Sequence, residues 1–342
     1  MQRRFARYAA VLLAAPLVLL GAQSAPQSVS VASKAPSAST VAKARANFIK
    51  DMSAHATALG GGAWTSPGAQ HADKAAVANG TVSEFPSYNW SGYADSESAT
   101  KTVTYVSGNW TMPSVTCPTA PYQNSDAFLA NWVGVDGFND ATVEQLGTAA
   151  QCFEGVTYYY VWYEMYPAGT VEEGTTACIN DNVNCPEPGD QISATVTVTP
   201  GSSGENDYAL TLKDHTRPRE SFSTTATCAT ATCVDSSGEW VIERPASELP
   251  FGAQILPLAD FNRTFFSAGD IVSGGKYSNI QGFNDGPVYD MPMMDDSTSY
   301  YLDCVDQPSR PGSVLSLTDT SACPTAAPTP SGGFETSWDA GF

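Results

Sequence analysis

Histidine is scarce in this sequence, and its scarcity narrows the chemistry that the chain can perform. Only three of the 342 residues are histidine, and only His215 lies after residue 86. No G-x-S-x-G nucleophile signature accompanies it. The sequence therefore argues against a Ser/His/Asp triad and a Cys/His pair. It also lacks a C-x-x-C pair, so we expect no zinc site.

Positive charge is also scarce. The chain has 16 Lys and Arg against 35 Asp and Glu, and after residue 86 the counts are eight and 32, a formal charge of −24. Such a surface cannot bind phosphate backbones, which excludes nucleic acid as a partner. Protonation near pH 4 would relieve the repulsion among the carboxylates, so the composition suits an acidic environment. The simpler interpretation is that acidity keeps a secreted protein soluble.

Long apolar runs are missing except at the N-terminus. The run Ala9–Leu20 follows Arg3, Arg4 and Arg7 and precedes the small residues of Ala22–Ser24. This pattern predicts a secretory signal peptide over residues 1–24. No later segment approaches the roughly 18 apolar residues of a membrane span. We therefore expect a secreted, extracellular protein without a membrane partner.

Residues 25–85 are rich in Ala, Ser and Gly and hold five basic residues before the acidic remainder begins. The stretch Ser39–Leu59 has helical character. We interpret residues 25–85 as a propeptide, mostly helical or disordered, and the alternative is a disordered linker. A basic propeptide would be held by the acidic body near neutral pH and released in acid.

Eight cysteines all follow residue 100. In an exported chain an even number predicts disulfides. Sequence proximity suggests four pairs, although eight cysteines permit 105 connectivities. The suggested pairs are Cys117–Cys152, Cys178–Cys185, Cys228–Cys233 and Cys304–Cys323.

The remaining pattern alternates with period two. Segments such as 102–106, 158–166, 191–198, 208–212 and 239–243 are rich in β-branched and aromatic residues, and Gly, Pro, Asn and Asp separate them. Many short strands at this spacing predict an all-β antiparallel sandwich or barrel over residues 86–342.

Alternation also places side chains, because residues two apart on a strand share a face. It puts Trp132 with Asp136, and it joins four residues of one strand, Tyr160, Trp162, Glu164 and Tyr166. Glu144 points away from Gln145. Glu239 and Glu243 share a face but lie about 13 Å apart, so they cannot hold one water molecule between them, and one of them must act with a group from another strand.

A glutamate that takes a proton from water and a glutamine that donates to an oxyanion are together sufficient for acyl hydrolysis. The simpler alternatives are that Glu243 is an exposed strand carboxylate, that the aromatic residues pack a core, and that Asp136 and Glu164 only brace their neighbours.

Eight motifs, in order, resemble the glutamic peptidases of the G1 type, the eqolisins. They cover most of residues 86–290 and are 89-NWSG, 106-VSGNWTMP, 132-WVGVDG, 145-QLG, 162-WYEMYP, 188-PGD, 239-EWVIE and 256-LPLADF. Where fungal members carry an Asp, this chain has Tyr160, and the segment from Asp136 to Gln145 is one residue shorter. A bacterial member is expected.

The resemblance implies a sandwich of two antiparallel sheets, lectin-like or concanavalin-like, with the active site on the concave face. It implies that Gln145 and Glu243 are catalytic. It assigns substrate binding to Trp90, Trp132, Asp136, Trp162, Glu164 and Tyr166. It also implies protein or peptide substrates and no cofactor. We expect the chain's own propeptide as a further partner, and nothing in the sequence demands more than a monomer.

The implied reaction is acid endopeptidase hydrolysis that pepstatin does not inhibit. Glu243 activates a water and Gln145 stabilises the oxyanion, while Trp132 N–H or Asp136 steadies Glu243. The alternatives are a secreted carbohydrate-binding sandwich and a glycoside hydrolase that uses Glu243 with a second carboxylate.

Overall fold

The computed structural model describes 36–59, 82–84, 87, 89–96, 102–118, 126–138, 140, 142–202, 204–228, 233–249, 252–261, 263–280, 288–291, 293, 320–324 and 334–340. Every structural statement below concerns these residues. For 53–59, 82–84, 246–249, 252–255, 320–324 and 334–340 only the backbone is described. The predicted signal peptide lies outside the described residues.

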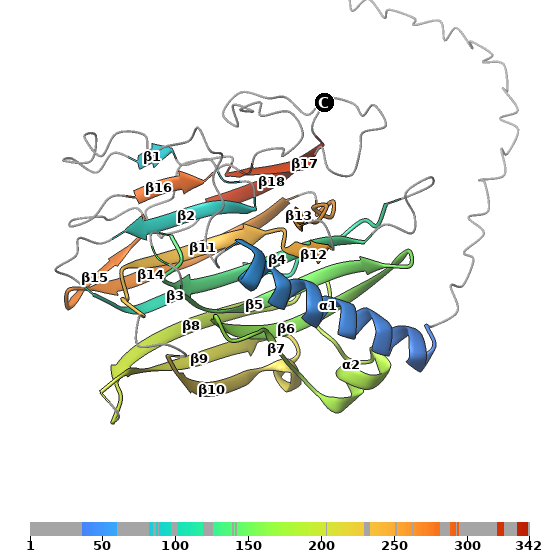
Figure 1. The fold of residues 1–342 in the computed structure, drawn as a ribbon, viewed down its shortest axis with the longest axis horizontal. Coiled ribbons are helices and arrows are strands. Elements are labelled where there is room, and N and C mark those ends of the chain that lie inside the picture. The colour runs from blue at the N-terminus through green and yellow to red at the C-terminus, as the bar shows by residue number, and fades with distance from the viewer. Residues whose placement is uncertain are drawn as a thin grey trace, which may run out of the picture. The chain divides into compact units, whose positions relative to one another are not determined.

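Strands dominate the chain (Figure 1). The helices are α1 (Ala38–Leu59), α2 (Thr176–Asp181) and the 3-10 helix η1 (Pro218–Glu220). The strands are β1 (Val82–Glu84), β2 (Trp90–Ser96), β3 (Val103–Thr111), β4 (Ala127–Val135), β5 (Val143–Phe153), β6 (Val156–Tyr166), β7 (Val171–Glu173), β8 (Gln191–Pro200), β9 (Asn206–Asp214), β10 (Phe222–Thr227), β11 (Ser237–Glu243), β12 (Ala246–Leu249), β13 (Gly252–Ile255), β14 (Arg263–Ser273), β15 (Lys276–Asn279), β16 (Val288–Met291), β17 (Thr320–Pro324) and β18 (Phe334–Ala340).

The strands form two large sheets. The first sheet has the order β1-β16-β2-β11-β4-β5-β6-β7, and the second has β10-β9-β8-β3-β14-β18-β17 with β15 beside β14. The pairings are antiparallel except that of β1 with β16. A separate hairpin joins β12 and β13. The prediction of an antiparallel two-sheet sandwich is confirmed.

The core between the sheets comes from the inward side of each alternating strand. Trp110 and Trp240 are its largest members, and each indole N–H finds an acceptor across the gap. Trp110 Nε1 donates to Thr148 Oγ1 at 2.9 Å, and Trp240 Nε1 donates to the Ser107 carbonyl at 2.7 Å. These bonds satisfy the polar ends of large apolar side chains and thereby fix the two sheets against each other.

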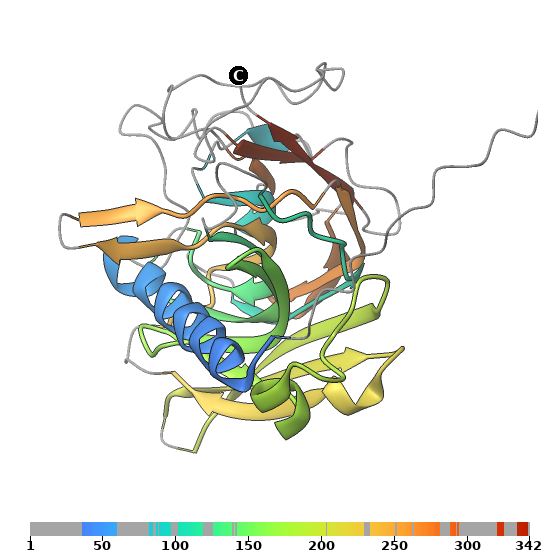
Figure 2. The ribbon, with the colours of Figure 1, turned by 90° about the vertical axis from the view of Figure 1, so that its right-hand side faces the viewer.

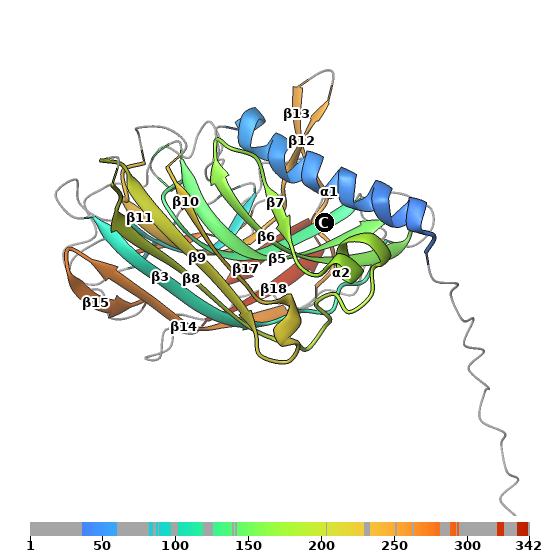
Figure 3. The same ribbon diagram turned by 90° about the horizontal axis from the view of Figure 1, so that it is seen from below.

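Helix α1 forms where helical character was predicted. Ser37 caps it, because its Oγ accepts the backbone N–H of Thr40 at 3.2 Å. Val41, Ala44, Phe48 and Met52 recur at helical spacing and are all buried. They pack on the outer face of the first sheet, the face turned away from the second sheet. Figures 2 and 3 show the blue helix lying along this sheet.

Three of the four predicted disulfides are present: Cys117–Cys152, Cys178–Cys185 and Cys228–Cys233. The fourth predicted pair, Cys304–Cys323, lies outside the residues whose side chains the structure describes. In the part of the chain that the structure describes, no helix is both long enough and apolar enough to cross a membrane.

Candidate active site

The outer face of the first sheet brings together the polar residues that the sequence singled out. Alternation along β5 puts Gln145 on the same face as Val143 and Ala149, and alternation along β11 puts Glu243 beside Val241. Val143, Ala149 and Val241 all pack in the outer-face cluster. Gln145 and Glu243 therefore lie on the same face of the same sheet, as predicted, and each is almost fully buried.

Two tryptophan side chains hold the Glu243 carboxylate. Trp90 Nε1 donates to Oε1 at 3.1 Å, and Trp132 Nε1 donates to Oε2 at 2.7 Å. The two indoles meet edge to face with centroids 4.8 Å apart. Both oxygens of the carboxyl group thus accept a hydrogen bond from an indole, which fixes its orientation in an apolar setting. The predicted contact from Trp132 is confirmed, and Trp90 supplies a second.

Gln145 is held from the opposite side. Its Nε2 donates to Glu164 Oε2 at 2.9 Å, and Thr170 Oγ1 donates to Glu164 Oε1 at 2.9 Å. A glutamine amide has two N–H donors, so one remains for a ligand. Gln145 Oε1 and Trp162 Nε1 are also buried, and neither has a hydrogen-bond partner among the described residues. This face can thus offer two donors and an acceptor to a peptide backbone.

The strand register gives the positions of Gln145 and Glu243 relative to each other on the sheet. Strand β4 lies between them, with Ala130 opposite Glu243 and Gly134 opposite Gln145. Trp132 occupies the position between these two rows. A Cβ atom added at Gly134 would come within 3.0 Å of Trp132 Cζ3 and 3.2 Å of Gln145 Cβ. Because Gly134 has no side chain, the Trp132 indole extends into the space beside Gln145 while its N–H donates to Glu243.

Asp136 does not take the position that strand alternation suggested. Strand β4 ends at Val135, and Asp136 has a left-handed backbone with φ 68°. Its carboxylate accepts backbone N–H groups from residues 234–236 at 2.6 to 3.0 Å and makes no hydrogen bond to Glu243. The expected contact with Glu243 was wrong, because the left-handed residue turns the side chain toward the loop before β11. A role in binding substrate stays a prediction.

Other predicted positions agree with the structure. Tyr160 and Trp162 pack in the outer-face cluster, and the half-buried Tyr166 packs against it. Glu144 points between the sheets, where its Oε1 lies 3.0 Å from Cys233 Sγ. Thr170, which braces Glu164, had no signal in the sequence because it follows the aromatic strand in an irregular segment.

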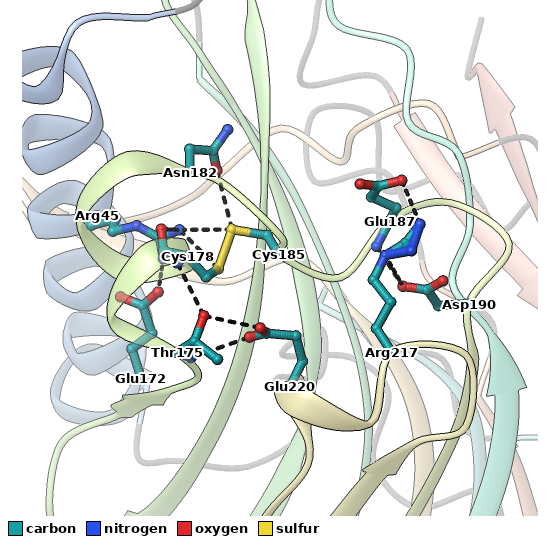
Figure 4. Close-up of a disulfide and its surroundings, with 10 residues drawn as sticks. All are labelled: Arg45, Glu172, Thr175, Cys178, Asn182, Cys185, Glu187, Asp190, Arg217 and Glu220. Carbon is teal, nitrogen blue, oxygen red and sulfur yellow. Dashed lines mark hydrogen bonds and ion pairs between the residues drawn. A yellow bond between two sulfur atoms is a disulfide. The ribbon is translucent and has the colours of Figure 1, made fainter.

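Helix α1 covers this face, and its side chains contact residues that are far away in the sequence. Phe48 stacks on Tyr160 with ring centroids 3.9 Å apart and planes 3° apart. Arg45 is buried, forms an ion pair with Glu172 and donates to the Cys178 carbonyl at 2.6 Å (Figure 4). Its Nη2 also lies 3.3 Å from both sulfurs of the Cys178–Cys185 disulfide. Figure 4 shows the guanidinium between Glu172 and this disulfide. The helix is thus anchored on the sheet that carries Gln145 and Glu243.

A group of acidic residues gathers near one end of the site. Burial raises the pKa of Asp136 to about 7, with Asp140 adding to the shift and the backbone donors opposing it. Burial, followed by the charge of Asp136, raises the pKa of Glu144 well above its usual value. Burial also raises the pKa of Glu239 well above its usual value, although the Ser237 hydroxyl acts in the opposite direction. In the described part of the chain, no group of three or more His, Cys, Asp and Glu side chains is placed to hold a metal ion.

These raised pKa values predict that the protein is more stable in mild acid. A carboxyl with a raised folded-state pKa stabilises the fold fully below its unfolded value, and this contribution is lost as pH rises through the folded value. For Asp136 the window runs from 3.8 to about 7. We expect Tm to fall by about 5 °C or more between pH 4.5 and 7.5. A shift of one pKa unit changes the free energy of unfolding by roughly 1.4 kcal/mol, and each kcal/mol changes Tm by roughly 2–4 °C.

Thermal unfolding of Asp140→Asn tests the cause of that shift. Asp140 Oδ1 accepts the backbone N–H groups of Gly137 and Thr142, and an asparagine oxygen can do the same. Removing the charge should raise Tm at pH 7.5 and narrow the difference between the two pH values. Glu205→Gln, at an exposed turn, is the matched control. Equal Tm values at both pH values in the unsubstituted protein would contradict the prediction.

Comparison with known proteins now gives the family. The model of the peptidase A4 family matches residues 88–303, which is more than half of the chain and contains Gln145, Glu243 and the other site residues predicted from the sequence. The chain belongs to the peptidase A4 family. This confirms the resemblance to the glutamic peptidases and the prediction of an endopeptidase. Membership also favours proteolysis over the carbohydrate-binding and glycosidase alternatives.

Two solved structures are similar to this chain. Scytalido-glutamic peptidase with a transition state analog inhibitor aligns with a TM-score of 0.50 and 18% identity, over 73% of this chain and 98% of the other. Aspergilloglutamic peptidase from Aspergillus niger aligns with a TM-score of 0.37 and 21% identity, over 62% and 99%. At this identity the first comparison supports the fold. Comparison with curated proteins gave no significant match.

Proposed function

We propose that this A4 peptidase is a secreted acid endopeptidase in which Glu243 and Gln145 form the catalytic pair. The observation that carries the proposal is the holding of Glu243 by two indole N–H groups on the face that also presents Gln145. A carboxylate has about four acceptor sites, so the two indoles do not exhaust them. Glu243 takes a proton from a water molecule, which then attacks the scissile carbonyl.

Gln145 supplies the second half of the reaction. With one N–H engaged by Glu164, its other N–H donates to the oxyanion of the tetrahedral intermediate. A glutamine suits acidic conditions because it does not titrate. Glu243 then transfers its proton to the leaving amine, and the peptide bond breaks. The substrate backbone is expected to pair with Trp162 Nε1, while Tyr166 and Asp136 remain expected contributors to substrate binding.

The propeptide proposal rests on the position of α1. The helix lies within residues 25–85 and buries Phe48 and Arg45 against the sheet that carries the catalytic pair. We propose that residues 1–24 are removed on export and that residues 25–85 close the site until they are cleaved. The three disulfides support an extracellular location, since such bonds persist in oxidising compartments. A monomer remains the expected state.

Digestion of a denatured protein tests the proposed function. The full chain is expressed without residues 1–24, incubated in acid, and assayed at pH 3 to 5 with and without pepstatin. We expect internal cleavage that pepstatin does not change. Release of single terminal residues only, or full inhibition by pepstatin, would contradict the proposal.

A further inference from the structure

Beside Glu243, the outer face of the first sheet has a row with very short side chains. The register runs from Glu243 to Ala130, then to Ala149, and then to Tyr160. Cross-strand neighbours have Cβ atoms only about 5 Å apart, so each position in this row adjoins the next. Two alanine methyl groups therefore form a low floor between the carboxyl group and the tyrosine ring.

Phe48 of α1 covers the tyrosine at the end of this row. It belongs to the same buried cluster as Ala130 and Ala149, and its side chain is fully buried. Its ring lies flat on Tyr160 at a centroid distance of 3.9 Å. The Arg45 guanidinium also lies over the Tyr160 ring, but at 5.0 Å. Of these two groups, the phenylalanine ring lies closer to the Tyr160 ring.

Tyr160 is held in this orientation by its own strand neighbours. Its hydroxyl donates to Gln151 Oε1 at 2.6 Å, and both residues are fully buried. Because this bond lies within the sheet, it does not depend on the helix. A ring that is fixed before a ligand arrives costs little further ordering on binding.

We propose that Ala130, Ala149, Tyr160 and Gln151 form a substrate subsite that selects an aromatic side chain, and that Phe48 fills this subsite while α1 is in place. The inference rests on the proposed function and adds a specificity to it. Removal of α1 exposes the floor and the tyrosine face together. A substrate ring then stacks on Tyr160, as Phe48 does, with its backbone close to Glu243.

The chemistry of the row favours aromatic side chains over the alternatives. An aliphatic side chain can cover the alanine floor but gains no ring stacking, which contributes beyond buried area. An acidic side chain would meet Glu243 and would be buried without a cation. The subsite therefore discriminates through the Tyr160 face.

Matched peptides test the proposal with the acid-activated protein. Two fluorogenic peptides differ only in one residue, Phe or Leu, in an otherwise Ala-rich sequence. We expect kcat/KM to be about tenfold higher for the Phe peptide, from a stacking contribution of the usual size. Tyr160→Leu should bring the ratio close to one while the Leu peptide is still cleaved. Tyr160→Phe should keep the ratio, and Tyr277→Leu, at an exposed position of the second sheet, is the control.

A second measurement needs no variant. Mass spectrometry of the fragments from a denatured protein should show Phe, Tyr or Trp enriched at one fixed distance from the cleaved bonds. Active protein without this enrichment, or Tyr160→Leu with an unchanged preference, would overturn the subsite. Absence of all peptidase activity in the unsubstituted protein would instead overturn the proposed function, and this inference with it.

Discussion

Replacing Gln145 with alanine is expected to lower kcat by a hundredfold or more at acidic pH. Gln145 carries the N–H that is available to an oxyanion, and removal of one such donor typically costs about 10²- to 10³-fold. The bond appears only in the transition state, so kcat should fall much more than KM changes. Initial rates over a range of peptide concentrations would show this.

The fold should survive this substitution, because Gln145 donates only to Glu164 among the described residues. Gln191→Ala, at an exposed position of β8, is a matched control and should keep its activity. Glu243→Gln should be at least as inactive as Gln145→Ala, since an amide cannot accept a proton from water. A loss below about tenfold for Gln145→Ala in a folded protein would contradict its assigned role.

Phe48→Ala is expected to activate the unprocessed chain by about a hundredfold or more. Truncation of a fully buried phenylalanine costs about 3–5 kcal/mol, and here the cost falls on the docking of α1. The population with an open site rises accordingly. The measurement is the initial rate on a fluorogenic peptide, taken while gel electrophoresis shows the chain still intact.

The exposed Lys43 provides the control on the same helix, and Lys43→Ala should leave the unprocessed chain inactive. Glu172→Gln should also activate, because it leaves Arg45 buried without its ionic partner, a change that costs about 3–5 kcal/mol in other proteins. An intact chain that is equally active with and without the Phe48→Ala substitution would show that α1 does not close the site.

Acid stabilises the docked helix through Asp126. Burial and the nearby Asp51 raise the pKa of this carboxyl to about 6. Its contribution to the docked fold is complete below 3.8 and is lost as pH rises through about 6. Through Asp126, a small fall below neutral pH therefore favours the docked helix.

Local pattern predicted the strands and their faces well. Period two in 158–166 and 239–243 gave β6 and β11, and alternation correctly separated Glu144 from Gln145. These features depend only on neighbouring residues along one strand. Helical character near Ser39–Leu59 was visible for the same reason.

Features set by distant pairing could not be predicted. Nothing local indicates that Ala130 and Ala149 fall between Glu243 and Tyr160, because register arises between strands. The left-handed backbone of Asp136 ended the alternation on which its placement relied. The contacts that anchor α1 join residues more than a hundred positions apart, and helical character carries no information about the surface a helix will cover.

A double-mutant cycle tests the central claim most directly. kcat/KM is measured for the acid-activated protein and for Gln145→Ala, Glu243→Gln and the double variant under the same acidic conditions. The effects of residues that act on one intermediate are strongly non-additive. The kcat/KM of the double variant should therefore be within about threefold of that of the less active single variant. Losses that multiply in the double variant would mean that the carboxyl and the amide act independently, and would contradict a shared catalytic step.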